Sequence, residues 1–428
     1  MSLIKDRNPQ KGMRDLLPKQ VELRNYVSSR ILDVYKKYGF SQIETPSLEN
    51  IELLSNGEGG ENEKILFKIL KRGEKLDLNN INDENSLVDM GLRYDLTVPM
   101  CRFYANNRAQ LPQVFKIAQF GDVWRAERPQ KGRFRQFKQF DIDIIGDKST
   151  SAEIELIFAT SEALMSLDFK NFKVRINDRR ILSGLVKYCG FKESDYNKVF
   201  VIIDKLSKIG IEGIKEEFKK SGFSDDSVNM LIEIIQKLIE TSVTIKTIES
   251  ILPNIDKNVL DDLSFVIETV SKQAGRNYSI VLDITLVRGM GYYTGQIFEI
   301  ETEGYKTSIA GGGRYDSLIG KFLGEATIPA CGFSIGFERV ISILEEQCFN
   351  VPKPKRKIVL LYSEEEISNI NEIFLTAQKL RAEGNIVLVE EKSKNPKVQL
   401  DKLMEQGFDS FAVFSNGKEI EVKTLGQK

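Results

Sequence analysis

The 428-residue chain contains no histidine. A serine–histidine–aspartate hydrolase is therefore excluded, and so is any histidine-ligated metal centre. The four cysteines lie far apart without Cys-x-x-Cys spacing, which argues against both a zinc site and a disulfide framework. Any chemistry must use carboxylates, arginine, lysine, tyrosine, backbone groups or phosphates carried by a substrate.

Long apolar runs and a large net charge are also missing. No stretch is apolar enough to cross a membrane, and the N-terminus lacks the apolar core of a secretion signal, so we expect a cytoplasmic protein without a membrane partner. The net charge of −1 argues against a uniformly basic nucleic-acid binder but leaves room for a local basic patch. A length of 428 residues predicts two or three domains.

Periodicity outlines the elements of these domains. Helices are expected at 19–38 and 152–166, strands at 40–46, 113–124, 137–146, 279–287 and 296–300, and mostly helices over 176–275. The basic, proline-bearing segment after residue 350 indicates a domain boundary. Beyond it the pattern becomes β-α-β-α-β, with strands at 357–362, 386–390 and 409–414 and helices at 366–383 and 397–406.

Five segments place arginine, glycine or carboxylates at the expected ends of strands. They are 91–97, 125–135, 286–296, 310–314 and Arg339 at a helix start. Arginine suits phosphate because its planar fork donates two parallel hydrogen bonds, and glycine permits close backbone approach to a ligand. Each segment alone has a structural alternative: a wet sheet face, a charged turn, a buried salt bridge, a flexible turn or a surface charge. Together they predict one antiparallel sheet whose polar face meets a nucleotide and a small zwitterion.

Three of these segments carry residues with a specific expected role. A strand over 91–97 would place Arg93, Asp95 and Thr97 on one face, where they can hold an amino acid. Arg288 lies between two expected strands and needs a partner if it is buried. The glycines at 310–314 do not match a phosphate-binding P-loop.

The segments resemble the motifs of the histidyl-tRNA synthetases, a class II family. Residues 125–137 resemble the second class II motif, and residues 331–339 resemble the third. Residues 286–295 and 310–316 resemble the two histidine-specific motifs. The stretches 11–18 and 39–46 resemble the N-terminal stretch and the dimer-forming first motif. The resemblance covers nearly the whole chain.

This resemblance implies an α+β fold. It consists of a catalytic domain at 1–350 with an antiparallel sheet of six or seven strands flanked by helices, a helical insertion at about 176–275, a linker at 351–356 and an α/β anticodon-binding domain at 357–428. It also implies a homodimer that uses ATP and Mg²⁺ to join histidine to tRNA(His). The Mg²⁺ would be held mainly by phosphates and water, without a dedicated protein metal site.

The resemblance further implies the residues that meet ATP. Arg125 would hold the α-phosphate, Arg339 the γ-phosphate end, and Arg288 both the α-phosphate and the histidine carboxylate. Arg125 and Arg288 would thus be the catalytic cations. Glu127 and Arg133 would contact the adenine side.

The histidine pocket is implied in the same way. Its residues would be Asp95 and Thr97 at the α-ammonium, Gln139 beside the amino acid, Asp143 and Tyr293 at the two imidazole nitrogens, and Tyr292 in the adjoining wall. Gln130 would read the tRNA acceptor end.

Four positions depart from the family pattern. Asp143 replaces a common Glu, Gly291 stands where many members have Asp, and Ala126 and Lys138 stand where relatives often have His. The hydrogen bonds around the histidine pocket are therefore expected to differ, whereas the phosphate-binding arginines are retained.

Two alternatives remain on the sequence alone. One is a regulatory subunit of ATP phosphoribosyltransferase, which usually lacks the anticodon-binding domain and parts of the ATP motifs. The other is a non-catalytic synthetase-like sensor of RNA or histidine. Retention of Arg125, Arg288, Arg339 and residues 357–428 favours the enzyme.

Overall fold

The computed structural model describes residues 7–55, 62–78, 84–130, 133–240, 243–288, 291–305, 307–325, 327–352 and 355–426. Lys131, Gly132, Gly289 and Met290 of the predicted motifs, and 353–354 of the expected linker, lie outside them. The chain divides into two compact units. The larger contains Met1–Arg14 and Val27–Glu346, and the smaller contains Asp15–Tyr26 and Gln347–Lys428.

The larger unit is built on an eight-stranded sheet in the order β1-β5-β6-β11-β10-β9-β7-β8. The six inner strands are antiparallel neighbours, and β1 and β8 join the two edges in parallel. The predicted antiparallel sheet is therefore confirmed at its centre, but six or seven strands are too few and both edges are parallel. Each parallel pair is joined by a long connection that contains helices, which such pairs require. The strands are β1 (Ser41–Gln42), β5 (Phe115–Trp124), β6 (Gln136–Ile145), β7 (Phe172–Asp178), β8 (Tyr278–Leu282), β9 (Gln296–Glu301), β10 (Ala310–Arg314) and β11 (Ala330–Ile335).

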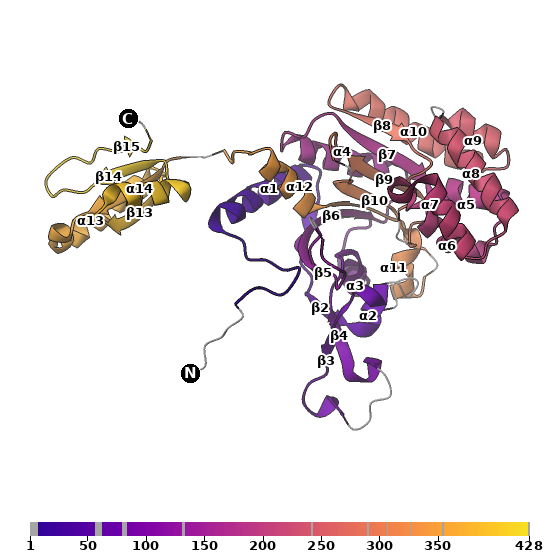
Figure 1. Cartoon of the computed structure of the whole chain (residues 1–428), viewed down its shortest axis with the longest axis horizontal. Coiled ribbons are helices and arrows are strands. Elements are labelled where there is room, and N and C mark those ends of the chain that lie inside the picture. Colours follow the sequence, from indigo (N-terminus) through magenta and orange to yellow (C-terminus); the bar gives the residue numbers. More distant parts are fainter. Residues whose placement is uncertain are drawn as a thin grey trace. The chain divides into compact units, whose positions relative to one another are not determined.

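Helices cover one face of this sheet (Figure 1). Tyr35 of α1 packs edge-on against Phe140 of β6, and Phe337 of α12 packs against Phe120 of β5. These contacts come from α1 (Pro18–Lys37) and α12 (Phe337–Glu346), and α4 (Ser151–Met165) packs on β6 and β11. The expected helices at 19–38 and 152–166 are confirmed, whereas the expected strand at 40–46 is reduced to the two residues of β1.

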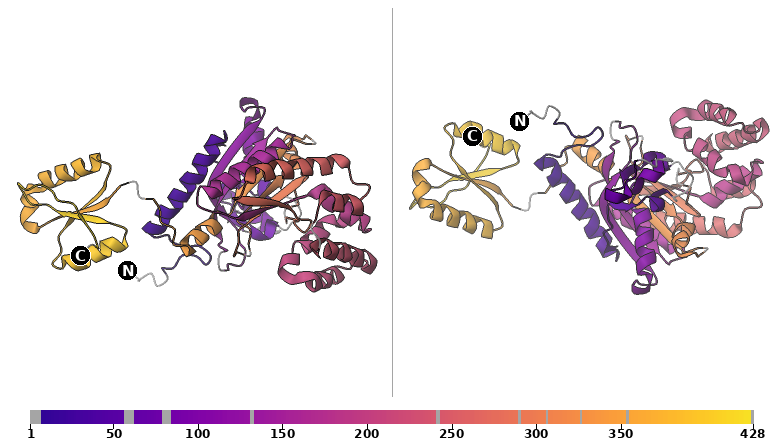
Figure 2. Two further views of the ribbon diagram at one scale, coloured as in Figure 1. Left: turned by 90° about the horizontal axis from the view of Figure 1, so that it is seen from above. Right: turned by 90° about the horizontal axis from the view of Figure 1, so that it is seen from below.

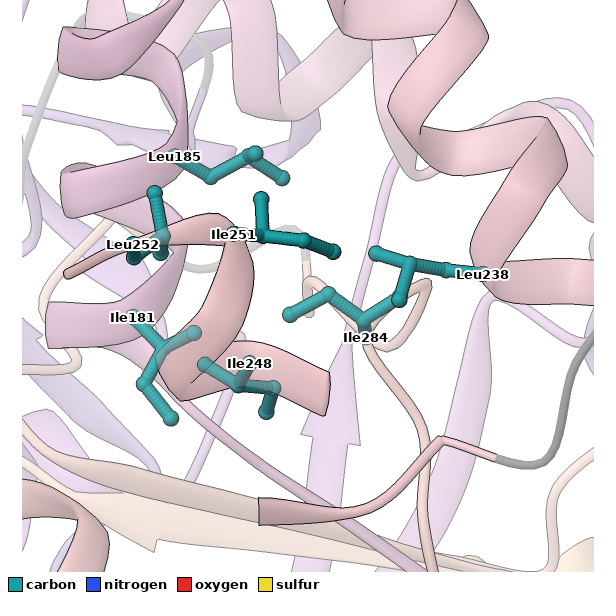
Figure 3. A pocket seen from close by; sticks show the side chains of 7 residues that line it. All are labelled: Ile181, Leu185, Leu238, Ile248, Ile251, Leu252 and Ile284. Atoms are coloured by element: carbon teal, nitrogen blue, oxygen red, sulfur yellow. The ribbon is translucent and has the colours of Figure 1, made fainter. Parts of the chain in front are cut away.

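A group of helices between β7 and β8 lies beside the sheet in both further views (Figure 2). It starts at Arg179, because residues 172–178 alternate apolar and polar side chains and form β7, so the predicted start at about 176 is corrected. The helices are α5 (Arg179–Tyr188), α6 (Tyr196–Ile203), α7 (Leu206–Lys220), α8 (Asp225–Glu240), α9 (Ile245–Ile251) and α10 (Lys257–Ala274). A cavity of about 10 Å³ among α5, α8 and α9 is lined only by leucine and isoleucine (Figure 3). It belongs to the apolar core of this group and has no polar atom to hold a ligand.

A second, small antiparallel sheet is formed by residues that precede β5 in the chain. Its strands lie in the order β2 (Leu48–Asn50), β4 (Val88–Leu92) and β3 (Phe67–Leu70). In the chain, α2 (Ile51–Ser55) follows β2, and α3 (Thr97–Asn107) follows β4. Helix α3 packs on α11 (Asp316–Leu323). The single strand predicted over 91–97 is wrong, because β4 ends at Leu92 and α3 begins at Thr97. Asp95 favours this turn, since its carboxylate accepts a hydrogen bond from the Val98 N–H at 3.1 Å.

The smaller unit contains a four-stranded sheet in the order β13-β12-β14-β15, whose first three strands are parallel. Its elements are β12 (Lys357–Tyr362), α13 (Ile370–Ala382), β13 (Ile386–Glu391), α14 (Pro396–Glu405), β14 (Ser410–Val413) and β15 (Lys423–Thr424). Alternate residues of β12 pack toward α13 on one face and α14 on the other. The predicted β-α-β-α-β order is confirmed, and β15 is an additional strand.

Short 3₁₀ helices complete the chain: η1 (Asn62–Ile65), η2 (Gly73–Lys75), η3 (Glu84–Leu87), η4 (Arg108–Gln110), η5 (Glu193–Asp195) and η6 (Glu364–Asn369). Within the described ranges, no helix combines the length and apolar character needed to span a bilayer.

Candidate active site

The face of the central sheet opposite α1 and α12 is polar. One row across it consists of Gln119, Asp141, Ser334, Gly311, Glu299 and Arg175, each paired in register with the next. Paired residues on neighbouring strands project to the same side of a sheet. The polar face predicted from the strand ends is therefore present, and it crosses the middle of the sheet.

Glycines make room for charged side chains on this face. A Cβ at Gly311 would overlap the guanidinium of Arg288, and a Cβ at Gly332 would overlap the carboxylate of Asp143. Gly311 of the glycine-rich β10 and Gly332 of β11 thus let an arginine and an aspartate lie directly against the strand backbone. A strand composed of glycine is unfavourable in itself, so the close approach explains its use here.

Arg288 has a left-handed backbone, with a φ of 57°. Its Nη1 donates to the Glu299 carboxylate at 3.0 Å, and the Ser308 hydroxyl donates to the same oxygen at 2.9 Å. The Arg339 guanidinium donates to the Ser308 backbone carbonyl. Glu299 and Ser308 therefore connect two of the predicted ATP-binding arginines.

The arginines of the site also feel one another. Burial and then the neighbouring charges of Arg288, Arg133 and Arg125 lower the pKa of Arg339, against the carboxylate of Glu299. Mutually repelling cations on one face are stabilised by an anion placed among them. The structure therefore brings together four guanidinium groups that come from three separate segments of the sequence.

Three aspartates form the other half of the site. Asp95, Asp141 and Asp143 are each 3% exposed. Burial raises the pKa of Asp95 to about 6, of Asp141 to about 7 and of Asp143 to about 8, and the charge of Asp141 adds to the rise at Asp143. The Tyr315 hydroxyl donates to Oδ1 of Asp143 at 2.5 Å.

Gln139 connects the arginines to the aspartates. Arg125 donates from Nη2 to the Gln139 Oε1 at 3.3 Å and from Nε to the Tyr94 carbonyl at 3.0 Å. The Gln139 Nε2 lies 3.4 Å from both carboxylate oxygens of Asp141 and 3.2 Å from the Ser334 Oγ. A continuous hydrogen-bonded chain therefore runs from Arg125 to Asp141.

Three buried polar atoms of the site have no hydrogen-bond partner among the described residues. They are Oδ2 of Asp95, Oδ2 of Asp143 and Nε of Arg288. Buried polar groups are nearly always paired, so unpaired ones need an explanation. Two acceptors and one donor left open on one face fit a ligand that carries two donors and one acceptor.

Comparison with known proteins places the chain. A family model described as Histidyl-tRNA synthetase matches residues 12–340. The chain belongs to the histidyl-tRNA synthetase family. A protein of Leifsonia xyli subsp. xyli (strain CTCB07) named histidine–tRNA ligase is 43% identical over 417 residues, which cover 94% of each chain.

Solved structures agree with this membership. The crystal structure of histidyl-tRNA synthetase from Nostoc sp. PCC 7120 superposes with a TM-score of 0.77 at 26% identity and covers 98% of this chain and 95% of its own. A Bacillus halodurans C structure described as an ATP phosphoribosyltransferase regulatory subunit/histidyl-tRNA synthetase has a TM-score of 0.72 at 22% identity. It covers 94% of this chain and 97% of its own, and at that identity it shows the fold alone.

The remaining predicted residues lie around this centre. Tyr292 and Tyr293 have ring centroids 4.8 Å apart, and the Arg288 guanidinium lies 6.0 Å from the Tyr293 ring centroid. Thr97 begins α3 two residues after Asp95. Gln130 lies further out, in the β5–β6 loop, where its backbone pairs with that of Arg133.

The same loop holds the predicted adenine contacts. The Arg133 Nη2 donates to the Glu127 carboxylate at 2.5 Å, so these two residues pair with each other here. The long charged hairpin between β5 and β6 is confirmed as a hairpin.

Sequence reasoning assigned no role to several polar residues of the site. They are Asp141, Glu299, Ser308, Tyr315 and Ser334. Asp141 had a usable signal, because it stands two residues before Asp143 in a strand and so shares its face. Arg93 has a structural role instead of the expected amino-acid contact, since it donates to the backbone carbonyls of Asp122 and Thr45 at 2.8 and 2.6 Å.

Proposed function

We propose that this chain activates histidine with ATP, forming histidyl-adenylate and pyrophosphate, and then transfers histidine to tRNA(His). The three unpaired atoms carry the proposal together with the family membership. Zwitterionic histidine offers an ammonium and an imidazole N–H as donors and a carboxylate as acceptor. These groups complement Asp95, Asp143 and Arg288 one for one.

The proposed histidine contacts follow from this complementarity. Asp95, with Thr97 beside it, receives the α-ammonium, and Gln139 lines the amino acid. Asp143 accepts from one imidazole nitrogen, and the Tyr293 hydroxyl meets the other, with Tyr292 behind it. An amino acid without these ring nitrogens would leave buried polar groups unpaired, which supports rejection on the order of 10⁴-fold or more.

The arginines are proposed to act on ATP. Arg125 and Arg288 hold the α-phosphate, where negative charge develops as the histidine carboxylate attacks. Arg339 holds the γ-phosphate end, and Glu127 and Arg133 meet the adenine side. Loss of one such pre-placed donor costs about 3–4 kcal/mol in the activation barrier.

Mg²⁺ is proposed to enter with ATP. ATP phosphates and water would supply most of its ligands, because this small ion keeps several waters when it binds. The carboxylate of Glu299 lies beside Arg288 and would supply one oxygen ligand. The ion would neutralise charge on the phosphates, while the arginines orient them.

The remaining assignments are also proposals. We assign residues 1–350 to the catalytic domain, 351–356 to a linker and 357–428 to an anticodon-binding domain, and we place Gln130 at the tRNA acceptor end. A homodimer in the cytoplasm is the proposed working form. The comparisons that show the family support these assignments.

The test is histidine-dependent ATP–pyrophosphate exchange by the purified chain. Exchange with histidine alone is expected, and Arg288→Ala is expected to reduce it about 10²–10³-fold. Arg108→Ala is a matched control, because this exposed arginine pairs with the exposed Glu325 and lies outside the proposed site. Absence of exchange with every amino acid would contradict the proposal and favour a regulatory subunit or a sensor.

A further inference from the structure

Asp141 is a buried carboxylate that has no binding or catalytic role in the proposed reaction. It lies in β6 between Gln139 and Asp143 on the polar face and is 3% exposed. The Ser334 hydroxyl donates to its Oδ1 at 2.5 Å, and the Gln139 amide nitrogen lies 3.4 Å from each of its oxygens. Both Asp141 oxygens thus have partners within the chain, unlike the open oxygens of Asp95 and Asp143.

The chemistry of its neighbours fixes the orientation of the Gln139 amide. A guanidinium only donates hydrogen bonds, and an ionised carboxylate only accepts them. A glutamine between Arg125 and Asp141 must therefore turn its oxygen toward the arginine and its nitrogen toward the aspartate. The observed contacts have this polarity, from the Arg125 Nη2 to Oε1 and from Nε2 to the carboxylate.

The fixed amide in turn orients Arg125. Two of its donors are engaged, one by the Tyr94 carbonyl and one by Gln139. These two contacts set the plane of the guanidinium, and its other N–H groups stay available for an anion. A reversed Gln139 amide would point an NH₂ group at Arg125 and push the guanidinium out of this plane.

We propose that Asp141 is a positioning residue for histidine activation, which acts through Gln139 to hold Arg125 toward the α-phosphate of ATP. This inference rests on the proposed function. Asp141 touches neither substrate in this scheme. Its effect should therefore appear in the rate of the chemical step and not in histidine affinity.

The first variant is Asp141→Asn, which keeps the size of the side chain but gives it a donor. The Gln139 amide is then free to reverse, and kcat for ATP–pyrophosphate exchange is expected to fall roughly 10- to 100-fold, as for a small misplacement of a reacting group. KM for histidine is expected to stay within about threefold, because Asp141 itself does not touch histidine and the proposed contacts of Asp95, Asp143 and Arg288 are kept. Asp256→Asn is the matched control, since this residue caps α10, a position where Asn serves as well as Asp.

A compensating change separates positioning from a general structural role. In the double variant, Gln139→Glu supplies a carboxylate that accepts both from Arg125 and from the new amide at position 141. The polarity of the chain is restored with the same number of carboxylates. The double variant is expected to recover at least tenfold in kcat over Asp141→Asn, a coupling that independent effects would not give.

Several outcomes would overturn the inference. A raised KM for histidine with unchanged kcat in Asp141→Asn would mean that Asp141 contacts the amino acid directly. Unchanged kcat and KM, or a double variant no better than the single one, would mean that it does not position Arg125. If Asp141→Asn has a lowered melting temperature, the double variant decides, because its restored hydrogen bonds predict recovery of both folding and exchange. Exchange by the unmodified chain keeps these failures distinct from failure of the proposed function.

Discussion

The sharpest prediction concerns two neighbouring glycines of β10 that face opposite sides of the sheet. The three atoms nearest to a Cβ at Gly311 all belong to the guanidinium of Arg288, the far end of a flexible side chain. The backbone can therefore stay in place while Arg288 moves off the strand. Displacing one pre-placed cation lowers kcat about 10²–10³-fold, which corresponds to ~2.7–4 kcal/mol in the activation barrier. Gly311→Ala is thus expected to approach Arg288→Ala in histidine-dependent exchange while keeping its melting temperature.

Gly312→Ala is the matched comparison from the same strand. Its Cβ would overlap the backbone carbonyl of Gly332 in β11, which cannot rotate away. Overpacking of this kind costs about 1–3 kcal/mol or more, and each kcal/mol lowers the melting temperature by about 2–4 °C in a domain of 150–250 residues. Exchange rates and thermal melts of both variants form the assay. Gly311→Ala retaining exchange within about threefold of the unmodified chain would refute the reasoning about Arg288.

The remaining predictions concern Asp143, the Arg314–Glu153 pair, the transfer step and the translation of the chain. Burial raises the pKa of Asp143 to about 8, so its carboxyl group is largely protonated in the empty site at pH 7. Histidine binding should ionise this group and release close to one proton, which calorimetry in buffers of different ionisation enthalpy would measure. Asp143→Asn should abolish the proton release. Because this folded-state pKa lies above the unfolded one, the ligand-free chain should lose stability as the pH rises from about 4 through 8, whereas a melting temperature that does not respond would count against the raised pKa. Arg314 pairs with the buried Glu153 at 2.6 Å, so Arg314→Met should cost about 3–5 kcal/mol in unfolding free energy, and adding Glu153→Leu should recover part of it. Because the chain has no imidazole, we expect a phosphate oxygen of the adenylate to take the proton of the tRNA hydroxyl. Histidine transfer from a phosphorothioate adenylate to tRNA should therefore be slower, and equal transfer rates would contradict this route. Finally, a chain without histidine should still be translated during histidine starvation. Pulse labelling would measure its rate of synthesis, and a fall equal to that of histidine-containing proteins would reject this idea.

Periodicity predicted the elements that have one clear apolar side. The helix that contains Phe337, Val340, Ile341 and Leu344 is confirmed, because all four side chains are buried at helical spacing. The segment around Asp95 was predicted wrongly, since alternation over seven residues cannot reveal that its carboxylate accepts from the Val98 N–H and starts a helix. The parallel edges of the sheet depend on long-range pairing, which local pattern does not encode.

The site shows a similar division. Arg125, Arg288 and Arg339 were predicted because arginine suits phosphate and each stands at an expected strand end or helix start, and the family resemblance implied their roles. Glu299 and Ser308 were not found, because an alternating strand with outward glutamates looks like a solvated face until Arg288 is folded onto it. Their role depends on which side chain lies above them, and that is fixed only by the tertiary fold.

The unpaired atoms of the pocket explain why its sequence looks unfavourable for a protein core. A buried polar atom without a partner costs free energy, and the site contains three such atoms, in Asp95, Asp143 and Arg288. It also includes β10, which is rich in glycine, a poor strand former. A ligand that supplies the missing partners offsets this cost only when it is bound. In the empty chain Asp143 reduces this cost by holding a proton, as its pKa, raised by burial to about 8, indicates. Under the proposed function, the substrate supplies the missing partners, so discrimination and affinity would both depend on these three atoms.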